Sequence, residues 1–331
     1  MVAHLEIRNH LKLNFQPHPL ARNVHFQTIV STLRRNEGLT LRRTAEEIIL
    51  EAGHGVRLQG YYSAQPTGQT RGLVMLLHGW LGCAGSNYVL TIGEHLYRRG
   101  YSIFRLNLRD HGDTHHLNPG LFRSDLLDEV FAATRRIAHL ESDHPFHLIG
   151  ASLGGNFVVR LAWRHAQTPI PNLNQTIAIN PVINPAATTA RLDTGFPIYL
   201  AYFRHKWRKS LQKKEAAYPN RYDFSEMLAA STCLAMTEAL VRHHTPYPDA
   251  QSYFARYTIT PEIVAALQSP VAMITAADDP IVPVIDFYPL SDLTDHLWVC
   301  IQPYGGHVGF IDIFPFRHWL NEAIPAILEN S

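Results

Sequence analysis

The sequence predicts an α/β protein with a mostly parallel central sheet, helices on both faces and one helical insertion. Short, continuously apolar runs alternate with longer segments of helical periodicity, which is typical of parallel strands buried on both faces. The 331 residues are 46% hydrophobic and 17% charged, as expected of a globular protein with a large core.

The N-terminal half supplies most of the expected elements. Residues 1–45 form a polar leader with a helix around Thr28 and Leu33, and residues 46–62 form an antiparallel hairpin that turns at Gly53-His54-Gly55. Buried strands are then predicted at 72–77, 101–107, 145–150 and 176–180. Helices are predicted between them at 86–99, 123–140 and 155–165.

The alternation breaks at residue 181 and resumes near residue 263. The intervening segment contains helix-like and proline-containing pieces, but no clear buried strand. Strands at 271–276 and 297–302 and a final helix from about 313 to 330 complete the pattern. We therefore expect a leader (1–45), an α/β core (46–180 and 263–331) and a helical cap (181–262).

Charge and composition exclude several classes of protein. The 29 basic and 28 acidic residues nearly cancel, so nothing favours nucleic-acid binding. The longest apolar run, 196–203, is far shorter than the roughly 20 residues of a spanning helix. No signal peptide is visible, and Cys83, Cys233 and Cys300 indicate buried thiols in a reducing compartment. We expect a soluble cytoplasmic protein; peripheral membrane contact and oligomeric state stay open.

The strongest local motif is Gly150-Ala151-Ser152-Leu153-Gly154, between a predicted strand and a predicted helix. A sharp strand-to-helix turn of this kind exposes a serine hydroxyl above the sheet, and glycines on either side let the backbone close up. Ser152 is therefore the candidate nucleophile.

A serine nucleophile needs a base that a third, acidic group orients. His307 lies in a glycine-rich loop after the strand at 297–302, whereas His296 and His318 lie in a polar approach and in the predicted final helix. Asp278 and Asp279 follow the strand at 271–276. The carboxyl ends of parallel strands are where such sheets bind ligands, which favours His307 as base and one of the two aspartates as acid.

The turn Leu77-His78-Gly79-Trp80 follows the first long core strand. Such a turn can direct a backbone N–H toward the nucleophile, where it would act with the N–H that follows the serine. The expected oxyanion donors are the amides of Trp80 and Leu153.

Two further clusters have competing interpretations. The histidine- and aspartate-rich stretch from Arg109 to His116 is interpreted as a structured loop near the site, with a metal site as the less favoured alternative. The basic residues of the insertion are interpreted as a solvated helix face, with attraction of an anionic lipid or substrate as the alternative. They are Arg204, Lys206, Arg208, Lys209, Lys213 and Lys214.

With these motifs placed, the chain resembles the α/β-hydrolases. More narrowly it resembles the YheT-like branch, related to abhydrolase-domain esterases and acylglycerol lipases, through three segments: Arg22-Asn23-Val24-His25-Phe26-Gln27-Thr28, Ser152-Leu153-Gly154-Gly155-Asn156 and Asp278-Asp279-Pro280. Relatives often carry an aromatic residue where this chain has Ala151. The resemblance implies an α/β-hydrolase fold, a Ser152–Asp279–His307 triad and carboxylic-ester hydrolysis without cofactor or metal. Asp279 is chosen over Asp278 because a proline follows four residues later, at Pro283, as in many such loops.

These observations favour a serine esterase acting on a small-molecule or lipid ester. Acyl transfer on the same triad, or a non-catalytic ligand-binding protein that kept the fold, are the alternatives. A dehalogenase is disfavoured because the turn carries Ser152 rather than an aspartate. Aromatic residues of the insertion, Tyr202, Phe203 and Trp207, are expected to line an apolar pocket that selects the substrate.

Overall fold

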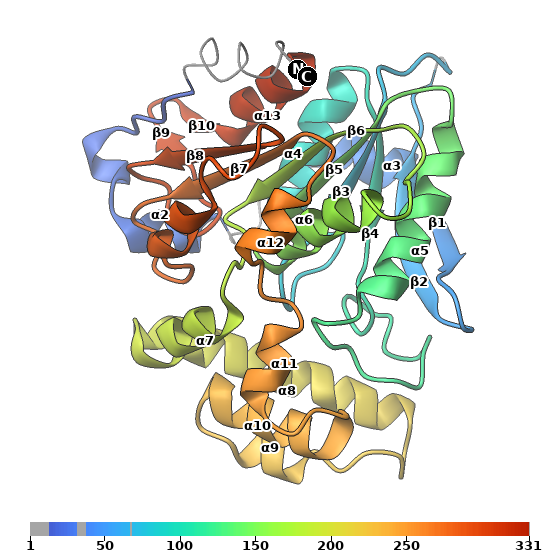
Figure 1. Ribbon diagram of the computed structural model, residues 1–331, viewed down its shortest axis with the longest axis vertical. Coiled ribbons are helices and arrows are strands. Elements are labelled where there is room, and N and C mark those ends of the chain that lie inside the picture. Colours follow the sequence, from blue (N-terminus) through green and yellow to red (C-terminus); the bar gives the residue numbers. More distant parts are fainter. Residues whose placement is uncertain (1–12, 32–37, 67, 331) are drawn as a thin grey trace.

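An eight-stranded sheet runs through the computed structural model, which describes residues 13–31, 38–66 and 68–330 (Figure 1). Its strands lie in the order β1-β2-β4-β3-β5-β6-β7-β8. Strands β3 to β8 are mutually parallel, and β1 and β2 extend one edge in antiparallel fashion. The bounds are β1 (Glu46–Glu51), β2 (Arg57–Ser63), β3 (Leu73–Leu77), β4 (Ser102–Leu106), β5 (Phe146–Ala151), β6 (Leu173–Ile179), β7 (Val271–Ala276) and β8 (Leu297–Gln302).

Helices cover both faces of this sheet. The core helices are α2 (Val24–Val30), α3 (Leu39–Thr44), α4 (Asn87–Arg98), α5 (Leu127–Ala138), α6 (Leu153–His165) and α13 (Leu320–Glu329). Strand β3 shows the two-sided burial, since Val74 and Leu76 belong to the apolar core with α4 and α13, whereas Leu73 and Met75 belong to the core with α5 and α6. Alternate residues of a strand point to opposite faces, so a strand buried on both must be apolar throughout. The predicted fold class is confirmed.

The C-terminal region corrects one sequence expectation. The final helix begins at Leu320 rather than near residue 313, and the preceding residues form a small antiparallel hairpin of β9 (Ile311–Ile313) and β10 (Phe316–His318). Pro315 lies in the turn of this hairpin, and proline disfavours the helical conformation in the residue before it. His318 is therefore a strand residue, not a helical one.

Six helices occupy the stretch between β6 and β7, and the short 3₁₀ helices lie elsewhere in the chain. The helices of the insertion are α7 (Pro185–Thr194), α8 (Pro197–Ala217), α9 (Ser225–Ala229), α10 (Cys233–His244), α11 (Ala250–Ala255) and α12 (Pro261–Ala265). The 3₁₀ helices are η1 (Pro19–Ala21), η2 (His139–Glu141) and η3 (Val284–Leu290). Helices α7 to α11 lie together below the sheet (Figure 1), and α8 to α10 enclose an apolar core that includes Trp207, Phe224 and Met236.

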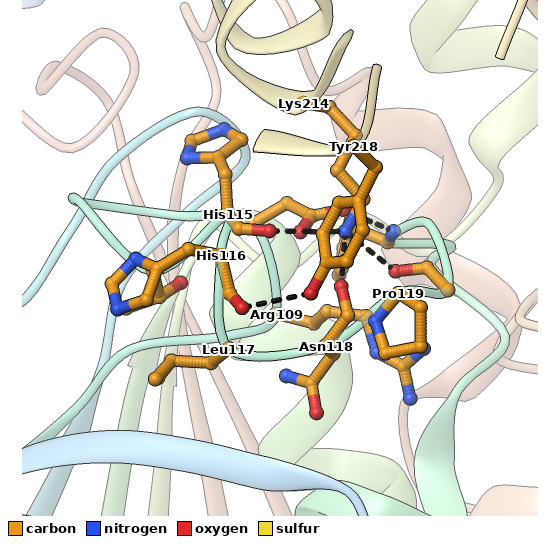
Figure 2. A network of polar contacts seen from close by, with 12 residues as sticks. Arg109, His115, His116, Leu117, Asn118, Pro119, Lys214 and Tyr218 are labelled. Carbon is orange, nitrogen blue, oxygen red and sulfur yellow. Dashed lines mark hydrogen bonds and ion pairs between the residues drawn. The ribbon is translucent and has the colours of Figure 1, made fainter. Parts of the chain in front are cut away.

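A buried lysine ties the longest helix of the insertion, α8, to the core. The Lys214 side chain is 1% exposed, and its ammonium donates to Asp110 Oδ1 at 2.8 Å. It also donates to carbonyl oxygens of the loop after β4, at Asn118 (2.6 Å) and Gly120 (2.9 Å) (Figure 2). The interpretation of the whole basic cluster as a solvated face is therefore wrong for Lys214, because the loop supplies enough oxygen acceptors to replace water around the ammonium.

Candidate functional site

The turn between β5 and α6 holds Ser152 in a strained conformation at the carboxyl edge of the sheet. Its φ and ψ are 55° and −120°, a backbone region that residues with a side chain rarely adopt. A Cβ atom on Gly150 would lie 2.1 Å from the Gly154 carbonyl oxygen, and one on Gly154 would lie 2.3 Å from the Leu77 carbonyl oxygen. Only glycine fits at these two positions, which explains the spacing of the motif around the serine.

The structure brings Ser152, His307 and Asp279 into one hydrogen-bonded relay. The Ser152 Oγ lies 2.9 Å from His307 Nε2, and His307 Nδ1 lies 2.9 Å from Asp279 Oδ2. His307 is 9% exposed and Asp279 2% exposed, whereas Ser152 is only half-buried. A ring whose Nδ1–H donates to the carboxylate leaves Nε2 free to accept the serine proton.

Backbone and side-chain donors hold the Asp279 carboxylate in place. Its Oδ1 accepts from the amides of Ile281 (2.8 Å) and Val282 (3.0 Å). Its Oδ2 accepts from Asn180 Nδ2 at 2.7 Å in addition to His307. Sequence reasoning missed Asn180, although its place at the carboxyl end of a predicted strand was a signal.

Asp278 has a different partner. Its Oδ1 accepts from the amide of Gly306 at 2.9 Å, and the hydrogen bond and ion pair of the His307 Nδ1 are made with Asp279 instead. Burial raises the pKa of the Asp278 carboxyl, the Gly306 amide opposes this shift, and the neighbouring Asp279 adds to it. Asp278 thus fastens the loop that carries the histidine.

The leader also supports the histidine loop. The Thr28 hydroxyl oxygen accepts from the backbone amide of His307 at 3.0 Å. The Gln27 side chain donates to the carbonyl oxygens of Ala21 (2.6 Å) and Ile311 (2.7 Å) and accepts from the Ile311 amide at 2.8 Å. Sequence reasoning assigned neither residue a role, although both belong to the leader segment on which the narrower resemblance rests.

The turn after β3 lies directly against the nucleophile. A Cβ atom on Gly79 would lie 3.0 Å from the Cβ of Ser152. Within the described part of the chain, neither the Trp80 amide nor the Leu153 amide donates a hydrogen bond to another protein group. The amide next to Ser152 in the chain and the amide next to Gly79 therefore both lack a protein acceptor.

A buried histidine shapes the start of this turn. The His78 ring donates from Nδ1 to the Gly79 carbonyl oxygen (2.8 Å) and accepts at Nε2 from the Leu108 amide (3.2 Å). Burial lowers the pKa of His78 far below its ordinary value, and the nearby His111 and Lys206 lower it further. His78 is therefore a neutral bridge between the ends of β3 and β4.

A second buried histidine holds the end of the turn. His111 donates from Nδ1 to the Arg109 carbonyl oxygen (2.7 Å), and its Nε2 accepts from the Leu81 amide (3.0 Å). Burial lowers its pKa to about 4, and only the neutral ring can accept at Nε2. The loop after β4 is thus a structured support of the site. Nowhere in the described ranges does a group of three or more His, Cys, Asp or Glu residues form a metal site.

A pocket of about 360 Å³ opens in front of Ser152 and His307. Its walls come from α2, the turn after β3, the start of α4, the loops after β7 and β8, and helix α8 of the insertion. The apolar and aromatic lining residues are Ile29, Trp80, Leu81, Tyr88, Ile198, Tyr199, Tyr202, Phe203, Ile281 and Val308.

Two expectations about this region need correction. Trp207 does not line the pocket, since it lies in the apolar core of the insertion and packs edge-on against Trp80, with ring centroids 4.9 Å apart. Cys83 is not buried but partly exposed, and it lines the pocket. Cys233 and Cys300 are buried, as expected.

Residues 72–312 match the family described as alpha/beta hydrolase fold, which covers most of the chain and the whole relay. The chain belongs to the α/β-hydrolase family. A Synechocystis sp. protein named as a candidate esterase is 25% identical over 297 residues, which is 83% of this chain and 79% of that protein. An abhydrolase domain-containing protein of Dictyostelium discoideum is 21% identical over 94% of this chain and 80% of its own length.

Solved structures of other proteins share the fold. The Pyrococcus furiosus esterase Pf2001 superposes with a TM-score of 0.57 at 15% identity, covering 90% of this chain and 94% of that one. Est1E from Butyrivibrio proteoclasticus gives a TM-score of 0.54 at 16% identity, with 86% of this chain and 98% of Est1E covered. No helix of this α/β-hydrolase, in the ranges the structure describes, has the length and apolarity needed to cross a membrane.

Proposed function

We propose that the protein is a serine hydrolase that cleaves carboxylic esters through an acyl-enzyme on Ser152. The observation that carries this proposal is the continuous Ser152–His307–Asp279 relay at the mouth of a mainly apolar pocket. The distant relationship to a Synechocystis sp. protein named as a candidate esterase supports the same reaction class. The proposed reaction uses protein groups and water.

In the first half-reaction, Ser152 Oγ attacks the ester carbonyl carbon while its proton passes to His307 Nε2. The Asp279 carboxylate stabilises the imidazolium that forms. The carbonyl oxygen becomes an oxyanion, and we assign the amides of Trp80 and Leu153 as its donors. Both amides lack protein acceptors; Leu153 follows Ser152 in the chain, and Trp80 follows Gly79, which packs against Ser152. The intermediate then collapses, and the leaving alkoxide takes the proton from Nε2.

The second half-reaction releases the acyl group. Water gives its proton to His307 Nε2 as its oxygen attacks the acyl carbon, which forms a second tetrahedral intermediate. When the bond to Ser152 Oγ breaks, the serine regains the proton and the carboxylic acid leaves. The same imidazole therefore acts as base and then as acid in both halves.

We further propose the segment 181–262 as a cap over an α/β core (46–180 and 263–331), and a place for the chain in the YheT-like branch. The cap assignment is supported by the helices from α7 to α11 that follow one another between β6 and β7. The branch assignment is supported by the leader, because Thr28 accepts from the amide of His307 and Gln27 bonds to Ile311, where the loop that carries His307 enters β9.

The direct test is turnover of para-nitrophenyl esters of increasing chain length, together with labelling by a fluorophosphonate probe. Wild-type protein should hydrolyse the esters and be labelled, and Ser152→Ala should lose both while unfolding at a similar temperature. Formation of a transferred ester instead of free acid, when an alcohol is added, would identify acyl transfer. Folded wild-type protein that neither turns over esters nor reacts with the probe would overturn the proposal.

A second test separates the two adjacent aspartates. Asp279→Asn should lower kcat by about 10⁴, the loss that the equivalent change causes in serine proteases. Asp278→Asn should lower kcat far less, because an asparagine oxygen can still accept from the Gly306 amide. The opposite ranking of kcat, with both variants folded, would move the acid to Asp278.

A further inference from the structure

The pocket in front of Ser152 contains one cationic side chain and no carboxylate. Among the described residues that line it, Lys206 is the sole lysine or arginine, and none is aspartate or glutamate. Lys206 comes from α8, is half-buried, and faces a wall that is otherwise mainly apolar. A charge in such a setting is screened less than one in open water.

The charge of Lys206 is not neutralised by the protein. Its Nζ donates to the Leu81 carbonyl oxygen at 2.9 Å and lies 5.2 Å from the centre of the Tyr202 ring. No carboxylate of the described residues lies within ion-pair distance of it. Two lysines of the same helix differ in this respect, since Lys213 pairs with Asp113 at 2.7 Å and Lys214 with Asp110 at 2.8 Å.

The Lys206 ammonium binds the same turn that carries a proposed oxyanion donor. Leu81, whose carbonyl oxygen it binds, follows the proposed oxyanion donor Trp80 in the turn after β3. An ammonium has three N–H donors, and the protein occupies one of them with the Leu81 oxygen. The others are available to a ligand in the same pocket as Ser152.

We propose that Lys206 determines substrate specificity by binding a negatively charged group, a carboxylate or a phosphate, carried by the ester substrate. This inference rests on the proposed esterase function. A pocket that holds one unpaired cation and no anion favours an anionic substrate over a neutral one of the same shape, and it disfavours a cationic substrate.

The test compares para-nitrophenyl esters that differ only at the end of the acyl chain. The monoester of adipic acid carries a carboxylate, the ester of 5-phosphonopentanoic acid a phosphonate, and the ester of 6-methylheptanoic acid a neutral branched end of similar shape. A second pair, para-carboxyphenyl and para-acetylphenyl butanoate, places the charge on the alcohol part. Rates are corrected for spontaneous hydrolysis with the Ser152→Ala protein.

We expect wild-type protein to prefer the charged member in the acyl series, the alcohol pair or both. Lys206→Met should lower the charged-to-neutral ratio of kcat/KM about tenfold, a typical effect of losing one charge-assisted hydrogen bond. Because Lys206 binds the Leu81 carbonyl oxygen, its replacement can also displace the turn after β3. A general loss of activity from that displacement lowers kcat/KM for both members of a pair, so it does not change the charged-to-neutral ratio. Lys206→Arg should retain most of the preference, and the acyl series shows whether carboxylate or phosphonate is favoured.

Lys209→Met is the matched control, because Lys209 is an exposed lysine of the same helix that does not line the pocket. It should leave the ratio unchanged. If the wild-type protein hydrolyses the esters without a charge preference in either series, or if the preference survives in Lys206→Met, the proposed role of Lys206 is overturned. The proposed esterase function would then still stand. Absence of all ester turnover and of probe labelling would instead overturn the proposed function itself.

Discussion

Replacing Lys214 by methionine should destabilise the protein severely, although the residue is far from Ser152 along the chain. Methionine fills much of the same space but removes the ammonium. The Asp110 carboxylate, 6% exposed, would keep its hydrogen bond from the Phe122 amide but lose its counter-ion. The Asn118 and Gly120 carbonyl oxygens would each lose a donor as well.

The expected loss of stability is large because both members of the ion pair, Lys214 and Asp110, are buried. Removing one partner of a buried ion pair typically costs about 3–5 kcal/mol, because the other charge stays buried without compensation. The entropy of unfolding is about 2.1 cal/mol/K per residue, or roughly 0.7 kcal/mol/K for a chain of this length. The melting temperature should therefore fall by about 4–7 °C.

Urea denaturation followed by tryptophan fluorescence, with calorimetry for the melting temperature, measures this loss. Lys213→Met is the matched control, since the neighbouring Lys213–Asp113 pair has exposed side chains (53% and 93%) and should contribute less than about 1 kcal/mol. Adding Asp110→Asn to Lys214→Met should recover part of the stability by removing the orphaned charge. Equal effects of the two lysine substitutions would refute the reasoning.

Three other outcomes are expected from the same structure. Thr28→Val, which leaves the buried His307 amide without its acceptor, should lower kcat about tenfold with little change in KM, and an unchanged kcat in steady-state assays would count against a positioning role. The free energy of unfolding should fall as the pH is lowered from about 6.5 toward 4, because the unfolded chain takes up a proton that folded His111 excludes. In His111→Gln, the drop in unfolding free energy between pH 6.5 and pH 4, measured by urea titration, should be smaller by up to about 3 kcal/mol. An equal drop in wild-type and variant protein would contradict the conclusion that His111 is neutral in the folded state. Phe203→Ala should shift the ester chain-length profile toward longer acyl groups while acetate turnover changes little, so a uniform loss at every length would argue against a selective wall.

Features that depend on neighbouring residues could be predicted from the sequence. The parallel sheet follows from apolar runs such as 72–77, because a strand covered on both faces needs apolar side chains at every position. The serine turn follows from Gly150 and Gly154, since the close backbone approaches there exclude any side chain. In both cases the residues that cause the structure lie within a few positions of one another, so the structure can be predicted from a short stretch of sequence.

Outside the Ser152–His307–Asp279 relay, whose members the motifs at the strand ends had pointed to, contacts between distant residues were decided by the tertiary structure alone. Lys214 has the same local pattern as its exposed neighbours, and only the loop 104 positions away makes it a buried counter-ion. The Thr28 hydroxyl accepts from the amide of His307, 279 positions away in the chain. The residues around Thr28 do not indicate that its helix packs against the loop that carries His307. A side chain's burial and partners depend on which segments the fold brings together, and residue spacing within one segment does not contain that information.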